Sequence, residues 1–218
     1  LWIGTNEGLS RYDPVTDHFA NYTFFEDQQP GQMSNRIYAV LAQHDTGVWI
    51  LMEDALLLFD PETGVRCRCD LHSAFPGEDI TARNAMLHAD RYGQVWLGVE
   101  DGLYRVDPHQ PALVPTAVQG TSVNTLHENR SGMFWLGTGD GLYQYDAEID
   151  RYVRHVPPGS GGMTVWGLVY YRGKYWMVTD EGVSVFDTDL QQFEKEKYIV
   201  YRDQRLPLSQ PRSMIRDR

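Results

Sequence analysis

The sequence predicts an all-β protein: a β-propeller built of four-stranded antiparallel blades, with about five blades' worth of chain in its 218 residues. Three observations predict this fold. A motif recurs five times, it recurs at intervals of 39 to 47 residues, and short apolar runs alternate with turn residues. Intervals of this size are typical of propellers and other repeat arrays. One tryptophan marks each unit: Trp2, Trp49, Trp96, Trp135 and Trp176.

The fourth unit shows most clearly which elements a repeat contains. Residues 123–129 alternate apolar and polar side chains, residues 134–137 form a short apolar run, and a last run covers 151–156. Alternation with a period of two predicts β-strands, and no stretch keeps a period of 3.6 long enough to require a helix. The repeats are expected at about 1–33, 34–80, 81–120, 121–161 and 162–208, with the start of a further repeat at 209–218.

A glycine and an aspartate recur with each tryptophan and are expected to shape turns. The glycine stands six residues after the tryptophan, with Ala55 as the one departure, and permits the positive φ of a two-residue hairpin turn. The aspartate stands eleven residues after it and suits a turn in which the side chain binds its own downstream backbone. These aspartates are Asp13, Asp60, Asp107, Asp146 and Asp187. Tryptophan is expected to wedge between neighbouring blades. One aspartate per blade at a turn cannot converge on a single ion, so we interpret the tryptophans, glycines and aspartates as scaffold and not as a metal site.

The string WLGTGDGLYQYD from Trp135, preceded by SVNTLHENRSG, resembles the two-component regulator propeller repeat. All five units match this pattern, so the resemblance covers nearly the whole chain. It implies the periplasmic sensor region of a hybrid histidine kinase or a related diguanylate cyclase. Such regions usually close seven blades, often beside a second propeller, and lead through an immunoglobulin-like domain and a membrane helix to a cytoplasmic signalling domain. The resemblance therefore implies that the chain is part of a seven-bladed propeller.

The two ends of the chain leave two interpretations open. The chain opens on the tryptophan strand of a unit and closes on PRSMIRDR, which has the pattern of the inner strand of a sixth unit. A segment of a larger propeller would begin and end in this way, and the resemblance favours this interpretation. A self-contained five-bladed ring, in which strands from the two termini pair within one blade, would also begin and end in this way.

Charge and composition disfavour several functions. The formal net charge is −11, and 30 acidic against 19 basic residues disfavour binding to a nucleic-acid backbone. No apolar run reaches 18 residues, so this segment is expected to make no membrane contact. Cys67 and Cys69 are interpreted as small apolar fillers on one face of a strand, with a strained redox pair as the alternative. The histidines are scattered and no catalytic motif is present, so no cofactor, metal or catalytic residue is expected.

A ligand site is expected where the outer strand of one blade connects to the inner strand of the next. The longest connections are residues 23–34 and 71–81, and long loops in a compact β-fold are often functional. Aromatic rings suit stacking on a sugar, while amide and guanidinium groups suit hydrogen bonds to hydroxyl groups. The candidate residues are Phe25, Phe75, Trp166, Asn35, Arg36, Arg83, Asn84, Asn124 and Arg212. Loop anchoring and turn formation are their alternative roles.

These observations together predict a ligand-sensing domain of a transmembrane signal-transduction protein, with a carbohydrate as a candidate ligand. The resemblance places it on the periplasmic or extracellular side of a bacterial inner membrane, where it would bind and transmit without catalysis. Its expected partners are a small molecule or oligosaccharide, the neighbouring propeller and signalling domains of the parent chain, and a second copy in a homodimer. A free-standing binding module or protein-interaction platform is the alternative, and a propeller lyase is a more distant one.

Overall fold

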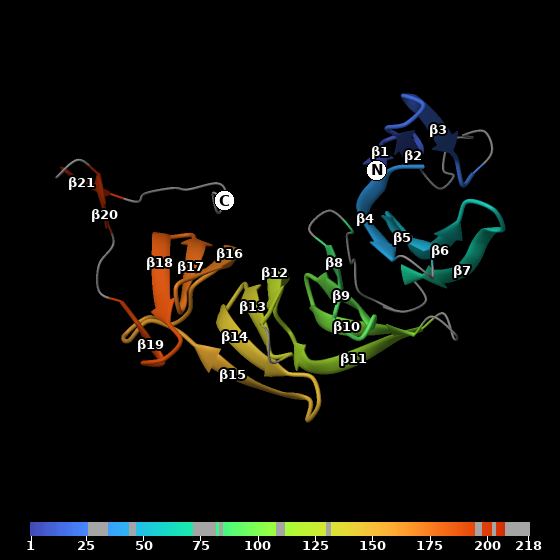
Figure 1. Ribbon diagram of the computed structural model, residues 1–218. Helices are drawn as coiled ribbons and strands as arrows, with labels where there is room; N and C mark the ends of the chain where they lie inside the picture. The colour runs from blue at the N-terminus through green and yellow to red at the C-terminus, as the bar shows by residue number, and fades with distance from the viewer. Residues whose placement is uncertain are drawn as a thin grey trace. The chain divides into compact units, whose positions relative to one another are not determined.

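The computed structural model consists of short antiparallel sheets that follow one another along the chain (Figure 1). The chain divides into two compact units, residues 1–116 and 117–218. The structure describes residues 1–25, 35–43, 47–71, 82, 85–107, 112–129, 132–194, 198–201 and 204–207, the last two segments by their backbone. No helix among these residues is long and apolar enough to cross a bilayer.

The first unit contains three sheets, and in each of them the strands lie in chain order. The first sheet has three strands, and the second and third have four. Their bounds are β1 Trp2–Thr5, β2 Gly8–Asp13, β3 His18–Tyr22, β4 Ile37–Gln43, β5 Gly47–Met52, β6 Ala55–Asp60, β7 Gly64–Asp70, β8 Met86–Ala89, β9 Val95–Val99, β10 Gly102–Asp107 and β11 Ala112–Gln119. The last residues of β11 lead into the second unit.

The second unit contains two four-stranded sheets and a separate two-stranded hairpin. Their bounds are β12 Val123–Glu128, β13 Phe134–Thr138, β14 Gly141–Asp146, β15 Arg151–His155, β16 Val165–Tyr171, β17 Lys174–Thr179, β18 Gly182–Asp187, β19 Gln192–Phe193, β20 Tyr198–Tyr201 and β21 Gln204–Pro207. Four short antiparallel strands paired in sequence make a propeller-type blade. The predicted all-β architecture of four-stranded antiparallel blades is therefore confirmed, and the first sheet differs in having three strands.

A threonine and the motif glycine together close the hairpin between the second and third strands of a blade. In the fourth sheet, Thr138 Oγ1 donates to the carbonyl oxygen of Gly141 at 2.9 Å and accepts from the Asp140 N–H at 3.1 Å. The β17–β18 hairpin of the fifth sheet and the β1–β2 hairpin of the three-stranded first sheet repeat both bonds. Gly141 has a φ of +140°, and a Cβ there would lie 2.9 Å from the carbonyl oxygen of His155. The recurring glycine is thus required by both backbone conformation and space.

The motif aspartates open the turns between the third and fourth strands. Asp60 Oδ1 accepts from the backbone N–H groups of Glu62 at 2.8 Å and Thr63 at 3.1 Å, and these bonds lower the pKa of the Asp60 carboxyl. Backbone N–H groups two residues downstream are bound in the same way by Asp13, Asp146 and Asp187. The turn that follows Asp107 lies outside the described residues.

The apolar core lies in the seams between successive sheets. The seam between the fourth and fifth sheets is built around Trp135, Tyr175 and Phe186, all nearly inaccessible to solvent. Gly137 allows these two sheets to approach, because a Cβ there would lie 2.7 Å from Val165 Cγ1 in the fifth sheet, and also 2.5 Å from Thr125 Cγ2 in its own sheet. Similar apolar clusters fill the two seams of the first unit. Each blade is therefore stabilised mainly by its neighbours.

Candidate functional site

Asn35 is buried and its side chain is used locally. Its Oδ1 accepts from the backbone N–H groups of Phe24 at 2.8 Å and Phe25 at 3.1 Å. Its Nδ2 donates to the carbonyl oxygen of Phe25 at 3.1 Å. Three hydrogen bonds hold the entrance of the connection against the start of β4, which is the turn-forming role named above as the alternative.

Arg36 and Phe25, the other described candidates in the first unit, differ in exposure. The Arg36 side chain is exposed and its guanidinium lies 5.1 Å from the centre of the Tyr38 ring. Phe25 is half-buried against the apolar cluster between the first two sheets, and the Arg68 guanidinium lies 5.3 Å from its ring centre. Of these two side chains, Arg36 is the more exposed.

Asn124 and Trp166 lie on the inner strands of the second unit. Asn124 Nδ2 donates to the carbonyl oxygen of Val165 at 3.0 Å and so joins β12 to β16. Trp166 follows Val165 directly, and 55% of its side chain is exposed. This exposure is high for the largest apolar side chain and leaves its ring available for stacking. The other candidates lie outside the described residues: Phe75, Arg83, Asn84 and Arg212.

The motif tryptophans take different positions in their seams. Trp49, Trp96 and Trp135 are 1%, 2% and 3% exposed, whereas Trp2 and Trp176 are half-buried. The ring centre of Trp135 lies 4.7 Å from that of Tyr175 and 5.6 Å from that of Phe186, both in the next sheet. The tryptophan therefore packs between two blades in this unit.

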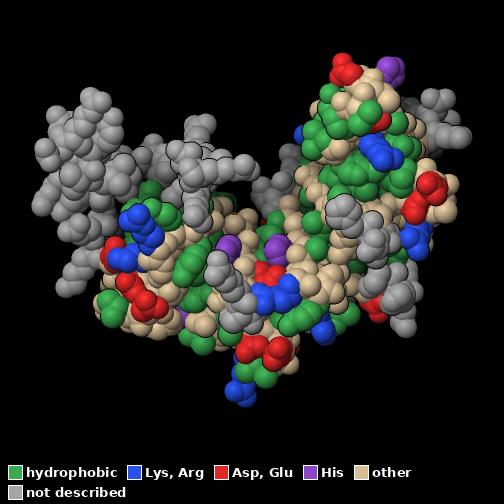
Figure 2. All heavy atoms as spheres, in the orientation of Figure 1, with side chains coloured by type: hydrophobic (Ala, Val, Ile, Leu, Met, Phe, Trp, Pro, Cys, Tyr) green, Lys and Arg blue, Asp and Glu red, His purple; other side chains and the backbone are tan. Residues whose placement is uncertain are grey.

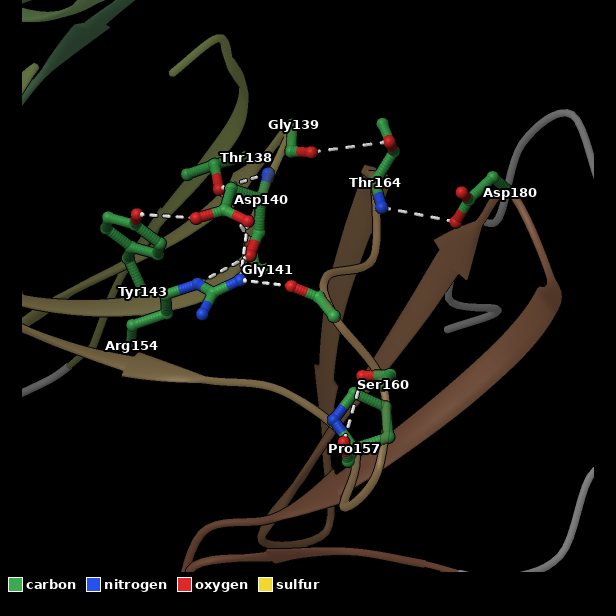
Figure 3. A network of polar contacts seen from close by, with 11 residues as sticks. Thr138, Gly139, Asp140, Gly141, Tyr143, Arg154, Pro157, Ser160, Thr164 and Asp180 are labelled. Carbon is green, nitrogen blue, oxygen red and sulfur yellow. Dashed lines mark hydrogen bonds and ion pairs between the residues drawn. The ribbon is translucent and has the colours of Figure 1, made fainter. Parts of the chain in front are cut away.

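A network of polar contacts ties the connection between the fourth and fifth sheets to the hairpin between β13 and β14 (Figure 3). Arg154 Nη2 forms an ion pair with Asp140 Oδ1 at 2.5 Å and also donates to the carbonyl oxygen of Gly161 at 3.1 Å. Thr164 Oγ1 donates to the carbonyl oxygen of Gly139 at 3.4 Å, and its N–H donates to Asp180 Oδ1 at 3.1 Å. These contacts fix the position of a glycine-rich segment whose sequence would permit many conformations.

A pocket of about 1050 Å³ lies at the opposite edge of the same two sheets, where β12 and β16 end. Its walls include His127, Trp135 and Gln144 from the fourth sheet and Tyr170 and Tyr175 from the fifth. The three residues of the fourth sheet share a face, because both His127 and Gln144 pair directly with Trp135. We call this space the seam pocket.

A hydrogen bond between the two sheets fixes one wall of the seam pocket. Tyr175 OH and His127 Nδ1 are 2.9 Å apart, and their rings meet edge to face. Burial, followed by the nearby Tyr170 hydroxyl, raises the pKa of Tyr175 far above its usual value. The phenol therefore keeps its proton and is available as a hydrogen-bond donor to the imidazole. The hydrogen bond between Tyr175 and His127 is therefore a polar contact within an otherwise aromatic part of the pocket lining.

The described residues include charged side chains of both signs and two free thiols. No group of three histidine, cysteine, aspartate or glutamate side chains among them has the geometry of a metal site. Figure 2 shows acidic and basic side chains interspersed over the visible described surface. Cys67 and Cys69 are free thiols, and burial is the first cause that raises the pKa of each. A neutral thiol is a poor nucleophile and a poor metal ligand.

Sequence reasoning missed the seam pocket. Its signals were present: His127 stands eight residues before Trp135, which places the two side by side on adjacent strands, and a Tyr-Tyr pair precedes the turn at Arg172. Tyr-Tyr at that place occurs only in the fifth unit, so it differs from the scaffold pattern. Residues that break a repeat are candidates for function because the fold does not require them.

Comparisons with known proteins show what fold this chain has. No protein-family model matches the sequence, and the search of curated proteins gave no match. A structure from B. thetaiotaomicron, described as the extracellular domain of a hybrid two component system, matches with a TM-score of 0.69 and 16% identity over 94% of this chain and 28% of that one.

A second extracellular domain described in this way, also from B. thetaiotaomicron, matches with a TM-score of 0.61 and 20% identity over 88% of this chain and 26% of that one. The Pan2 WD40 domain of Neurospora crassa matches with a TM-score of 0.57 and 14% identity over 95% of this chain and 62% of that one. The chain thus spans less than two thirds of each of these structures. Together with the blade geometry, these likenesses show that the chain has a β-propeller fold.

Proposed function

We propose that this chain is the ligand-sensing propeller region of a transmembrane signal-transduction protein of the two-component regulator propeller type. The observation that carries the proposal is the likeness of fold to two extracellular domains of hybrid two component systems, over 94% and 88% of this chain. The domain would lie on the periplasmic or extracellular side of a bacterial inner membrane. The parent chain would continue to a histidine kinase or diguanylate cyclase domain.

Strand β16 supports a carbohydrate as the ligand. It carries three aromatic side chains with open ring surface: Trp166 is 55% exposed, Tyr170 40% and Tyr171 39%. Exposing large aromatic side chains to water is unfavourable, so covering them with a ligand gains free energy. Their flat rings can stack on the apolar faces of sugar rings. The acidic protein, with a net charge of −11, would repel anionic ligands more than neutral ones.

The natural reading frame around this segment provides the first test. We expect further propeller repeats, a membrane helix and a kinase or cyclase domain in the same frame. The full-length protein in membrane vesicles should then change its rate of autophosphorylation or of cyclic di-GMP synthesis when a neutral oligosaccharide is added on the propeller side. A frame that encodes an export signal and no signalling domain would refute the sensor proposal and favour a free-standing binding module.

A further inference from the structure

The seam pocket lies at the edge of the two sheets opposite to the connections that the sequence indicated. The connection between β15 and β16 lies beside the β13–β14 hairpin and is tied to it by Arg154 and Thr164. In antiparallel blades, the β12–β13 and β16–β17 turns lie at the other edge, and the seam pocket is lined by residues at the ends of β12 and β16. The pocket is thus separate from the candidate residues Asn124 and Trp166.

One wall of the seam pocket offers flat aromatic surface. The Tyr170 ring centre lies 5.0 Å from that of Tyr175 and 5.9 Å from that of His127, with the His127 and Tyr170 rings only 20° from parallel. Tyr175 is buried, whereas Tyr170 and Tyr171 are about two-fifths exposed. The inner residues therefore support the ring of Tyr170 while it keeps an open side.

The rest of the lining is polar and close to neutral. Amide groups come from Asn129, Gln144 and Gln191, and a hydroxyl comes from Thr188. Within the protein, Gln191 Nε2 donates to the carbonyl oxygen of Thr188 at 2.7 Å, and Thr188 Oγ1 donates to the carbonyl oxygen of Gly173 at 2.6 Å. Asn129 Oδ1 accepts from the backbone N–H of Met133 at 3.0 Å. The one carboxylate, Glu128, is balanced by the guanidinium of Arg172, which lies 5.0 Å from the centre of the Tyr171 ring. An amide group has two N–H donors and acceptor lone pairs, so Gln191 can bond a hydroxyl group of a polyol in addition to Thr188, and Thr188 Oγ1 can accept a hydrogen bond from one. A lining without net charge gives no electrostatic preference for a charged ligand.

The equivalent seams of the first unit have different linings at the same place. The residue nine positions after each tryptophan pairs with it across the hairpin: Arg11, Leu58, Arg105, Gln144 and Val185. The seam between the first two sheets presents Arg11 beside Trp2, and the next presents Leu58 beside Trp49. Only the seam pocket among these three combines an amide at this position with a tyrosine pair.

From these observations we propose that the seam pocket binds a neutral sugar ring, with Tyr170 stacking on the ring and Gln144 and Gln191 bonding its hydroxyl groups. This inference rests on the proposed ligand-sensing function and gives it a site. His127 is a positioning residue, because its bond to Tyr175 holds the aromatic wall of the fifth sheet against the fourth. A sugar bound there would contact both sheets at once.

Calorimetric titration of the 218-residue chain tests the site. The probes are neutral di- and tetrasaccharides of glucose, xylose, galactose and arabinose, together with glucuronic acid and glucosamine as charged analogues. We expect at least one neutral probe to bind, and Tyr170→Ala and Gln191→Ala each to raise its Kd about tenfold, since one lost stacking or paired polar contact is worth about that factor. Tyr170→Phe should retain the stacking part of the affinity.

Tyr152→Ala is the matched control. Tyr152 is 41% exposed and stacks on Tyr143 at 4.6 Å in the same unit, outside the seam pocket. The Tyr152→Ala substitution should leave the Kd for the sugar probe unchanged. Because Tyr170 packs on Tyr175, its alanine variant can perturb folding, so Gln191→Ala and the backbone amide NMR shifts of residues 171–173 in the wild type give independent readouts.

Three results would overturn the inference: no neutral probe binds the wild type, Tyr170→Ala and Gln191→Ala keep the wild-type Kd, or a charged analogue binds more tightly than its neutral counterpart. None of these results would contradict the proposed sensor function, which the reading-frame and phosphorylation tests decide separately. Conversely, if a sugar binds in the seam pocket but the reading frame encodes no signalling domain, the binding site is supported and the sensor function is refuted.

Discussion

Replacing Trp135 with alanine should destabilise the second unit by about 3 to 5 kcal/mol, the cost typical of removing a large aromatic side chain from a packed core. Trp135 is 3% exposed and its ring packs on Tyr175 at 4.7 Å, Phe186 at 5.6 Å and His155 at 5.6 Å. The lost ring contacts and the cavity that remains both contribute. Two of these three partners belong to the next sheet, so the substitution weakens the joint between blades.

Urea unfolding followed by circular dichroism, with hydrogen exchange of the β12–β18 amides, measures this loss. Trp176→Ala is the matched control because Trp176 holds the same place in its repeat but is only half-buried, so its replacement should cost about half as much or less. Equal losses for the two variants, or a loss below about 1 kcal/mol for Trp135→Ala, would refute the claim that the seam carries the stability.

Three further outcomes are expected. Burial lowers the pKa of His155, whose Nε2 has no hydrogen-bond partner among the described residues, so the folded state favours neutral imidazole. The contribution of His155 to the free energy of unfolding is therefore fully present above its unfolded pKa of about 6.5 and is lost as the pH falls below that value. The urea midpoint of the wild type should decline from pH 7 to pH 5 more than that of His155→Leu, and parallel declines for the two proteins would contradict this. Gly137→Ala should cost about 1 to 3 kcal/mol by forcing a methyl group against Thr125 and Val165, and a melting temperature equal to the wild type would contradict it. Cys69, buried and with a raised pKa, should react with iodoacetamide at pH 7.4 far more slowly than in urea, as mass spectrometry can measure.

The sequence was sufficient to predict the blades because each depends on local spacing. A tryptophan, a glycine six residues on and an aspartate eleven residues on mark strands and turns that form within one unit. The hydrogen bonds of Thr138 to Gly141 and of Asp60 to Glu62 span three and two residues, so the periodic pattern includes them. Fixed offsets and turn chemistry thus predict the architecture without knowledge of distant contacts.

The seam pocket could not be predicted in the same way, because it depends on which side chains of two different units face each other. His127 and Tyr175 are 48 residues apart in sequence, and nothing in the repeat pattern of either indicates their hydrogen bond. Asn35 shows the converse difficulty. Its type and place suit a ligand contact, yet the structure uses its amide for the backbone of Phe24 and Phe25.

The residue nine positions after each tryptophan has a consequence for how this protein can acquire new specificities. Every unit presents that position on the same strand beside the same indole, while the glycine, threonine and aspartate that shape the blade lie elsewhere. Arginine, leucine and glutamine already occupy it in three seams. In an evolving or engineered propeller, this position can therefore be substituted in each seam separately to change what the seam recognises, while the residues needed for folding stay unchanged.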